Sequence, residues 1–384
     1  MQQARLFNTL ESILETPVED FLMAQKRHSQ SVLMGKELPL LLFGSGFLGR
    51  HTLRCLRKSM IEPIAFVDNA SHLWGSVIDG LPVESPSEAF RKHKGSALFV
   101  VTLYNNAKAM KQLEEASVDY LTFAEFAWEK PESLMPHYAI DFPYSIHRHS
   151  SDIRQVFDIL ADDESKAEFV AQINWRTSLD RSWDIAHKNP ELIYFDPEFV
   201  RLDGGNVIVD CGAFDGDTIR ELVNKEVNFT KLIAIEPDDD NFLRLQQYLM
   251  TLNSDLKERI EVHKLVVSSE SGTVGFDKMG DGKSGINHMG KCEVEKVSLD
   301  SLLACECPTL IKMDIEGAEY DALLGCRSII NKHHPMLAIS LYHTPEDLWR
   351  IPLLISKLYH GYNLHIRRYA DDCWEQVCYA IPRV

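Results

Sequence analysis

The segment Val207–Thr218 constrains the fold of this chain more than any other part of the sequence. It reads Val-Ile-Val-Asp-Cys-Gly-Ala-Phe-Asp-Gly-Asp-Thr, an apolar run that enters a glycine-bearing turn and then a helix-compatible stretch. A strand, turn and helix in this order is typical of α/β proteins with a parallel sheet. Gly212 and Gly216 let the backbone approach a ligand, and free amides at the helix start favour a carboxylate or a phosphate.

An acidic residue ends the next apolar run, at Glu236-Pro237, 20 residues after Gly216. A carboxylate at this place can accept hydrogen bonds from both hydroxyls of a ribose. A redox dinucleotide would require the pattern G-x-G-x-x-G, whereas Asp210 and Asp215 stand at its outer two positions here. S-adenosylmethionine, a nucleoside with a carboxylate, fits the two motifs better. The alternative is an ordinary strand-to-helix turn without a ligand.

Carboxylates also follow a later apolar run, residues 309–314. Its carboxyl end delivers Asp314 and Glu316 to the edge of the sheet where ligands of open α/β folds bind. There they can act as a base, bind a metal or balance the charge of a sulfonium. Glu316 and Glu319 also have a simpler explanation, because carboxylates stabilise the first turn of a helix.

His343 is predicted at the same edge, because it follows the apolar run 336–341. A histidine near its ordinary pKa of about 6.5 can remove a hydroxyl proton, or it can satisfy backbone groups at a helix start. Asp314, Glu316 and His343 are therefore the candidate catalytic residues. They also offer oxygen and nitrogen ligands to a divalent metal, but no spacing requires one, so metal dependence stays open.

These motifs resemble those of the FkbM-type S-adenosylmethionine-dependent methyltransferases, over about residues 190–384. The resemblance implies a seven-stranded class I methyltransferase fold and O-methylation, commonly of sugars or other hydroxylated natural products. Four motifs carry it in the same order, namely Val209–Thr218, Ile235–Pro237, Val297–Asp300 and Ile311–Glu319.

The resemblance also implies cofactor contacts. Asp210 anchors the turn and Glu236 takes the ribose hydroxyls, while residues 212–214 face the methionine part of the cofactor and 267–268 border the adenine. Tyr194 and Phe195 either close over the cofactor or are buried linker aromatics. The expected cofactor-binding residues are Asp210, Gly212, Ala213, Phe214, Gly216, Glu236, Pro237, Val267, Ser268 and Asp314.

A second glycine pattern lies near the N-terminus. After the apolar run 38–43 come three glycines, and Asp68 ends the next run, which satisfies the dinucleotide-binding pattern. The region also resembles small Rossmann-like domains of sugar-modifying enzymes, through Phe66–Asn69 and Gly80–Pro86. Three roles remain open for this region. It could bind a nucleotide or nucleotide-linked sugar, position the substrate, or pack as a scaffold. The glycines are Gly44, Gly46 and Gly49.

The order of the runs predicts an α/β protein with a smaller Rossmann-like domain before the methyltransferase domain. The first domain has strands near 38–43, 64–68 and 97–102. The second has seven, near 207–210, 232–236, 261–267, 309–314, 336–341, 363–367 and 377–381, with the last two as an antiparallel edge pair. We expect a helical lead-in at 1–36, the small domain at 37–128, a mostly helical connection at 129–200 and the methyltransferase domain at 201–384.

Composition narrows the kinds of partner and the cell compartment that we expect for this chain. A formal net charge of −17 argues against nucleic acid as the main partner. The chain shows no secretory signal, and no apolar run approaches the roughly 18 to 20 residues that span a bilayer. Its eight cysteines are scattered without C-x-x-C spacing, so we expect reduced thiols in the cytoplasm. Both a monomer and a homo-oligomer remain compatible with the sequence.

The sequence thus predicts an S-adenosylmethionine-dependent enzyme that O-methylates a sugar, a glycan or a related small molecule, with a nucleotide-linked sugar among the acceptors considered. One alternative is N- or C-methylation, which would use the same cofactor site. Another is a non-catalytic protein that binds nucleotides or nucleotide-linked sugars. The carboxylates of Asp314 and Glu316 favour the enzyme. The glycine-rich loop at 280–287 is either a substrate lid or a surface excursion.

Overall fold

The structure is a computed structural model, and it describes residues 2–33, 38–181, 185–201, 203–277, 285–286 and 292–383. The chain forms two compact units, neither of which is continuous in sequence. The first unit comprises Met1–Ser150, Val170–His187 and Ala370–Trp374, and the second comprises Ser151–Phe169, Lys188–Tyr369 and Glu375–Val384. No described helix combines the length and the apolar character needed to cross a membrane.

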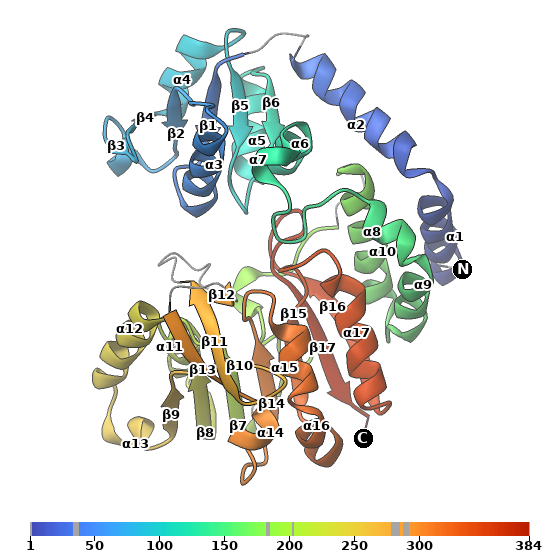
Figure 1. Cartoon of the computed structure of the whole chain (residues 1–384), viewed down its shortest axis with the longest axis vertical. Coiled ribbons are helices and arrows are strands. Elements are labelled where there is room, and N and C mark those ends of the chain that lie inside the picture. The colour runs from blue at the N-terminus through green and yellow to red at the C-terminus, as the bar shows by residue number, and fades with distance from the viewer. Residues whose placement is uncertain are drawn as a thin grey trace. The chain divides into compact units, whose positions relative to one another are not determined.

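A six-stranded sheet in the order β3-β4-β2-β1-β5-β6 lies at the centre of the first unit (Figure 1). Neighbouring strands are parallel, except for β3 beside β4. β1, β2 and β5 are apolar and buried, as is usual for parallel strands covered on both faces. The strands are β1 (Leu40–Phe43), β2 (Ala65–Val67), β3 (Val77–Ile78), β4 (Leu81–Glu84), β5 (Leu98–Val101) and β6 (Tyr120–Thr122).

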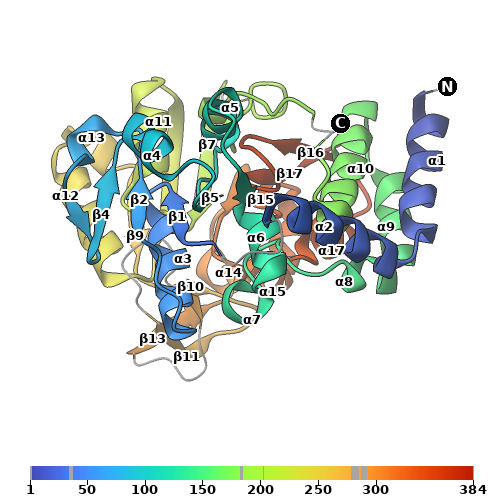
Figure 2. The same ribbon diagram turned by 90° about the horizontal axis from the view of Figure 1, so that it is seen from above.

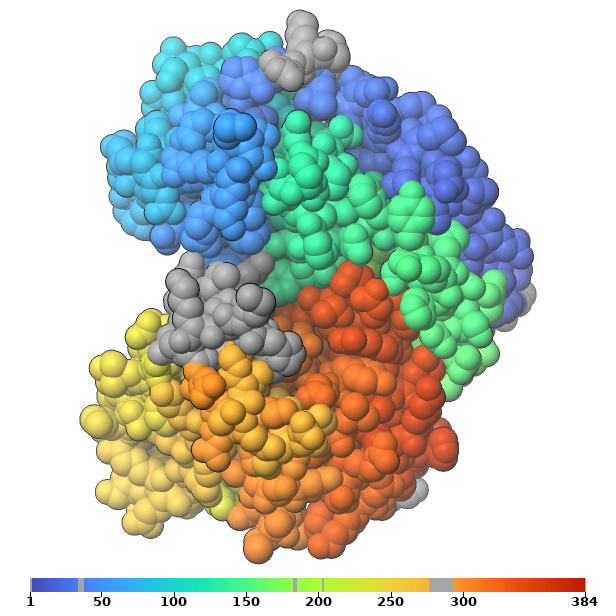
Figure 3. All heavy atoms as spheres, viewed as in Figure 1, coloured from blue at the N-terminus to red at the C-terminus, as the bar shows by residue number. Residues whose placement is uncertain are grey.

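Short helices connect these strands, and α3 lies against β1 (Figure 2). A capping box between Thr122 and Glu125 starts α6. α1 and α2, drawn in blue, lie at the surface (Figure 3). The helices are α1 (Gln2–Glu15), α2 (Val18–Leu33), α3 (Phe47–Lys58), η1 (Ser71–Leu73), α4 (Pro86–His93), α5 (Ala107–Glu115), α6 (Phe123–Glu129), α7 (Pro131–Leu134) and α8 (Tyr144–Arg148).

A seven-stranded sheet in the order β16-β17-β15-β14-β7-β8-β9 forms the second unit (Figure 1). β7, β8, β9, β14 and β15 are parallel, whereas β17 runs antiparallel to both β15 and β16. This is the predicted doubly wound sheet with an antiparallel edge pair. The strands are β7 (Asp203–Cys211), β8 (Asn228–Ile235), β9 (Ile260–His263), β14 (Leu310–Met313), β15 (Met336–Ser340), β16 (Tyr362–Arg368) and β17 (Gln376–Pro382).

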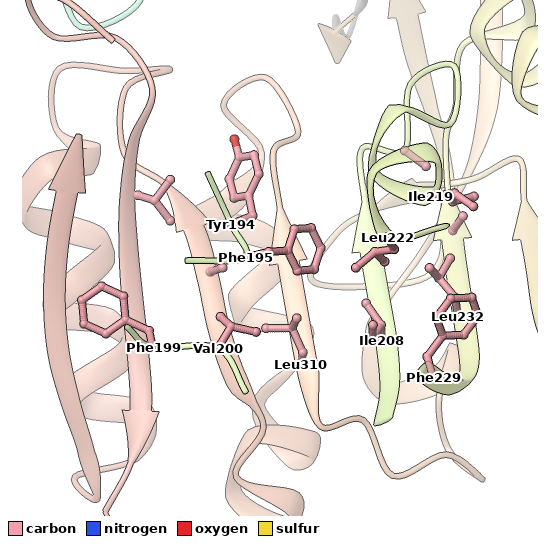
Figure 4. Packing of buried hydrophobic residues seen from close by; sticks show 14 of the residues in the cluster. Tyr194, Phe195, Phe199, Val200, Ile208, Ile219, Leu222, Phe229, Leu232 and Leu310 are labelled. Atoms are coloured by element: carbon pink, nitrogen blue, oxygen red, sulfur yellow. The ribbon is translucent and has the colours of Figure 1, made fainter. Parts of the chain in front are cut away.

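Apolar side chains of the sheet pack against the helices and against the segment before β7. Figure 4 shows Ile208 and Leu310 on neighbouring strands, with Phe229 and Leu232 of β8 in the same cluster. Helices α9 and α10 each contribute residues to both units. The helices are α9 (Ser150–Ile159), α10 (Asp163–Ser178), η2 (Pro190–Leu192), α11 (Asp217–Asn224), α12 (Asp239–Met250), α13 (Ser254–Lys257), α14 (Leu299–Leu302), α15 (Glu319–Leu324), α16 (Arg327–His333) and α17 (Asp347–Leu358).

The sequence prediction of one strand over 261–267 was wrong. The run divides into β9, at the edge of the large sheet, and β10, which pairs with β13 in a separate four-stranded sheet. His263 and Lys264, two polar residues, lie where the run breaks. The second sheet has the order β10-β13-β11-β12 and comprises β10 (Val266–Val267), β11 (Gly272–Asp277), β12 (Gly285–Ile286) and β13 (Cys292–Val297).

The three glycines between β1 and α3 have different surroundings. Gly44 adopts a φ of +118°, in the region that favours glycine. A Cβ atom on Gly49 would lie 1.9 Å from the carbonyl oxygen of Gly44, so helix and strand pack too closely for a side chain. A Cβ atom on Gly46 would have no heavy atom within 4 Å. Only Gly44 and Gly49 are therefore required by the packing of the turn.

We expect Gly49→Ala to lower the free energy of unfolding by about 1–3 kcal/mol, because the new methyl group forces α3 away from β1. Gly46→Ala is the matched control and should change it by less than about 0.5 kcal/mol. Urea unfolding followed by circular dichroism measures both. Equal effects of the two substitutions would contradict the close packing of Gly49.

Candidate functional site

The carboxyl ends of β7, β8 and β14 meet at a pocket of about 310 Å³ in the second unit. This volume lies within the range of small-molecule sites. Several residues expected from the sequence line it, namely Gly212, Phe214, Glu236, Pro237, Val267, Asp314 and Glu316. The remaining lining residues are Ile193, Tyr194, Asp217, Thr218, Glu221, Ile235, Asn241, Leu265, Val266, Lys312, Ile315 and Ala318.

The glycine turn after β7 brings its backbone against the end of β14. Gly212 has a φ of +87°, and a Cβ atom there would lie 1.9 Å from the carbonyl oxygen of Asp314. Gly216, also at +87°, is the N-cap of α11 but does not line the pocket. Ala213 is buried in the hydrophobic core. Of this turn, Gly212 and Phe214 therefore reach the pocket, while the other two residues support it.

Glu236 connects the first turn to the second strand. Its Oε2 accepts a hydrogen bond from the amide of Phe214 at 2.9 Å, and its Oε1 accepts one from the amide of Asp238 at 2.9 Å. Burial raises the pKa of Glu236 to about 7, although these amides and the side chain of Asn241 act in the opposite direction. The carboxylate thus orders both loops of the pocket, and its protonation changes near neutral pH.

Asp210 does not line the pocket but forms a buried ion pair behind it. Lys312 Nζ lies 2.7 Å from Asp210 Oδ1 and 3.1 Å from the carbonyl oxygen of Gly212, and 5.0 Å from the centre of the Tyr194 ring. Burial lowers the pKa of Lys312, but the charges of Asp210 and Asp314 outweigh it and the pKa rises. The pair joins β7 to β14 directly beneath the glycine turn.

The sequence prediction did not include Lys312. The residue lies within the apolar run 309–314 as its one charged member before Asp314. A lysine in a buried strand requires a partner of opposite charge. A charged residue inside an apolar run was therefore a signal in the sequence, although the prediction from motifs did not use it. Asp217 and Thr218 were missed although they follow Gly216 directly. They line the pocket from the first turn of α11.

Two hydroxyl donors and an imidazole nitrogen surround one oxygen of Asp314. Its Oδ1 accepts hydrogen bonds from Ser340 Oγ at 3.2 Å and from the hydroxyl of Tyr342 at 3.3 Å, and it lies 3.2 Å from His343 Nε2. Burial raises the pKa of Asp314, but His343 and the charge of Lys312 outweigh it and hold the pKa well below its usual range. Asp314 is therefore a fixed, ionised carboxylate in the pocket wall.

His343 lies behind Asp314 and does not line the pocket. Its Nδ1 is 2.7 Å from Glu319 Oε1, and its Nε2 is 4.0 Å from Glu316 Oε2. Burial lowers the pKa of His343, but the carboxylates of Glu319, Asp314 and Glu316 outweigh it and raise the pKa well above its ordinary value. Glu319, for which the sequence offered a capping role, is fully buried at this ring.

Asp314, Glu319 and His343 are close enough to be considered as a metal site, with ligand atoms within 4.8 Å of one another. However, Glu319 approaches Nδ1 and Asp314 approaches Nε2, at opposite sides of the imidazole. A metal ion bound to either ring nitrogen of His343 would have one of these carboxylates beside it and the other on the opposite side of the ring. The arrangement is that of an imidazole hydrogen-bonded to Glu319 on one side and at ion-pair distance from Asp314 on the other.

Two expected residues near the adenine position differ in their contacts. Val267 lines the pocket together with Leu265 and Val266, which form an apolar wall. Ser268 instead donates a hydrogen bond to Asp321 Oδ2 at 2.7 Å and is not part of the lining. The predicted lid at 280–287 lies outside the described residues, apart from the backbone of 285–286.

In the second glycine pattern, the carboxylate of Asp68 accepts hydrogen bonds from residues of the neighbouring loops. Asp68 Oδ2 accepts hydrogen bonds from the amide of Ser45 at 2.9 Å and from its hydroxyl at 2.6 Å, and Oδ1 accepts one from the amide of Ala70 at 2.9 Å. Glu236 is held by donors of its own loops in the same way, so these contacts alone do not distinguish the two carboxylates. Gly46, at the N-cap of α3, leaves open space beside the helix start.

Comparisons with known proteins show which proteins this chain resembles. Residues 210–373 match the model of the methyltransferase FkbM domain. The structure resembles that of methyltransferase FkbM from Methylobacillus flagellatus KT, with a TM-score of 0.73 and 24% identity over 94% of this chain and 98% of that chain. This likeness shows a shared fold.

An rRNA methylase from Streptococcus thermophilus also matches, with a TM-score of 0.30 and 13% identity over 47% of this chain and 90% of that chain. A comparison with curated proteins gives no match.

We expect Lys312→Met to lower the free energy of unfolding by about 3–5 kcal/mol, because it leaves the Asp210 carboxylate buried without its counter-charge. The double variant Asp210→Asn/Lys312→Met should recover part of this loss, since it removes both charges. Urea unfolding of the single and double variants measures the coupling. Additive losses in the double variant would show that the pair contributes no mutual stabilisation.

Proposed function

We propose that this chain transfers the methyl group of S-adenosylmethionine to a hydroxyl of a sugar, a glycan or a related small molecule, since residues 210–373 match the model of the methyltransferase FkbM domain. The observation that carries the proposal is that Glu236 and Asp314 line one pocket. A ribose bound at Glu236 would leave room for an acceptor near Asp314, which follows β14. A nucleoside cofactor and a methyl acceptor would then share the site.

The pocket offers a contact for each part of the cofactor. The turn at Gly212 and Phe214 would hold the methionine part, and Glu236 would accept hydrogen bonds from the ribose hydroxyls. The apolar wall of Leu265 and Val267 borders the adenine. S-adenosylmethionine would supply an electrophilic methyl group on a sulfonium, and the ionised Asp314 would balance its positive charge.

Methyl transfer would be an in-line displacement, in which alignment of the acceptor contributes most of the rate. The hydroxyl oxygen forms a bond to the methyl carbon while the bond from that carbon to sulfur breaks, and S-adenosylhomocysteine leaves. The hydroxyl proton passes to the carboxylate of Asp314. Oδ1 of Asp314 accepts hydrogen bonds from Ser340 and Tyr342, so we assign the acceptor hydroxyl to Oδ2.

We propose that residues 37–128 form a separate domain that holds or recognises the acceptor, with a nucleotide-linked sugar as one class. The open space at Gly46 supports this, because the helix start there would accommodate a phosphate. A non-catalytic binding protein remains the alternative, as does transfer to nitrogen or carbon. The net charge of −17 supports an acceptor other than nucleic acid.

We expect S-adenosylhomocysteine to bind more tightly as the pH rises from about 5.5 to the pKa of Glu236, about 7, and then to level off. The ribose hydroxyls require the ionised carboxylate, so below this pKa a proton must be released on binding. The dissociation constant should fall by at most about tenfold per pH unit. Isothermal titration calorimetry at several pH values measures it.

Glu236→Gln should remove this pH dependence, and Glu236→Ala should weaken binding by roughly 30- to 1000-fold, or about 2–4 kcal/mol. Glu261→Ala on β9, outside the pocket, is the matched control and should bind as the wild type does. If the protein bound NAD and not S-adenosylhomocysteine, the cofactor assignment would be wrong.

We expect Asp314→Asn to abolish methyl transfer, by about 10²-fold or more, while S-adenosylhomocysteine still binds. The amide keeps the shape of the side chain but cannot take the hydroxyl proton. Transfer from methyl-labelled S-adenosylmethionine to a panel of sugars, nucleotide-linked sugars and amines measures the activity and separates transfer to oxygen from transfer to nitrogen. Unchanged turnover in this variant would remove Asp314 from the mechanism.

A further inference from the structure

A buried imidazole stands between two carboxylates directly behind the proposed acceptor position. His343 Nδ1 lies 2.7 Å from Glu319 Oε1, and Nε2 lies 3.2 Å from Asp314 Oδ1. Nδ1 is hydrogen-bonded to Glu319, and Nε2 lies at ion-pair distance from Asp314, so carboxylates flank the ring on both sides. Negative charge on both sides of the ring favours the imidazolium form of His343.

We propose that Glu319 and His343 are positioning residues: Glu319 holds His343 as an imidazolium, and His343 fixes the Asp314 carboxylate that receives the acceptor proton. The inference rests on the proposed function and deepens it, because it divides the roles among the acidic and basic groups of the same site. His343 itself is not the base, since an imidazolium has no lone pair to accept a proton.

Glu319 fixes the loop that carries Asp314 as well as the ring. Its Oε1 accepts a hydrogen bond from the amide of Ile315 at 2.8 Å, and its Oε2 accepts one from the amide of Gly317 at 3.0 Å. Between them, Glu316 adopts a φ of +55°, which is uncommon for a residue with a side chain. One fully buried carboxylate thus holds both the strained loop and His343. A capping role alone would not require the contact with the ring.

The carboxylates of Glu319, Asp314 and Glu316 favour the same protonation state. Two further carboxyls near the ring contribute less negative charge. Burial raises the pKa of Glu375 to about 7 and also raises the pKa of Asp347, so these two carboxyls resist ionisation. Arg350 pairs with Asp347 at 2.8 Å. The titratable and charged groups around His343 come from three elements, namely Asp314, Glu316 and Glu319 after β14, Asp347 and Arg350 of α17, and Glu375 before β17, with Tyr342 adjacent in sequence.

The positioning role and a base role predict opposite effects of removing the Glu319 charge. If His343 positions Asp314, the imidazolium is the active form, and Glu319→Gln makes it lose its proton at lower pH. If His343 were the base, the neutral ring would be the active form, and the same substitution would favour it. The protonation state of the ring at neutral pH therefore decides between the two roles.

The test is nuclear magnetic resonance of the full chain with ¹⁵N-labelled histidine, recorded from about pH 6 to pH 9, with His343→Gln to assign the signal. We expect both ring nitrogens of His343 to be protonated at neutral pH. Glu319→Gln should move its titration midpoint to lower pH. Asp314→Asn should do the same while it leaves the Glu319 contacts to Ile315 and Gly317 in place, so the result does not depend on one variant folding.

Glu84→Gln is the matched control, because it removes the carboxylate beside another histidine, His93, at 3.1 Å. It should leave the His343 signal unchanged. A neutral His343 ring at neutral pH, or a midpoint that neither variant moves, would overturn the proposal. So would loss of the Nε2 proton on addition of Mg²⁺ or Mn²⁺, which would indicate a metal centre.

The same samples separate this proposal from the proposed function. Calorimetry with S-adenosylhomocysteine tests the cofactor site, whereas the imidazole signal is read with and without that compound. Absence of binding with a protonated ring would reject the cofactor assignment and keep the Glu319–His343–Asp314 chain. Binding of S-adenosylhomocysteine to a protein with a neutral His343 ring would keep the cofactor assignment and reject the positioning role of His343.

Discussion

The close approach of β7 and β14 is the constraint on which the rest of the site depends. At Gly212 the two backbones leave no room for a Cβ atom, and just below it Asp210 and Lys312 form an ion pair with 0% and 4% of their side chains exposed. If the strands moved apart, the carbonyl of Gly212 would lose its contact with Lys312. The turn and Asp314 would then no longer face one another.

A buried ion pair is a costly way to join two strands, because desolvation of both charges opposes their attraction. What distinguishes this pair is its additional contacts. Lys312 donates to the carbonyl of Gly212 as well as to Asp210, and its charge also acts on Asp314. An apolar pair of the same volume could join the strands, but it could neither hold the turn nor keep the pKa of Asp314 low. The contacts of this pair therefore relate it to the site rather than to a gain in stability.

The large sheet could be predicted from the sequence because its parallel strands are continuous apolar runs that need no knowledge of their partners. The glycine turn and Glu236 were predictable for a similar reason, since their spacing along the chain is local. The division of 261–267 between two sheets was not, because it depends on the pairing of Val266 with Lys296, 30 residues on. The ring contacts of Glu319 and the place of His343 behind Asp314 likewise depend on how loops from β14 and β15 meet.

Glu236 and Asp314 show how one pocket gives two carboxylates opposite properties. Both line it, but Glu236 faces neutral amides and the negative charge of Asp238, so burial dominates and its pKa rises. Asp314 faces an imidazolium and an ammonium group, and these charges outweigh its burial, so its pKa falls. A carboxylate that stays ionised suits a place beside a sulfonium, where a neutral acid would give no counter-charge. A carboxylate that titrates near neutrality suits a hydrogen-bonding contact, where the ligand itself can stabilise the ionised form.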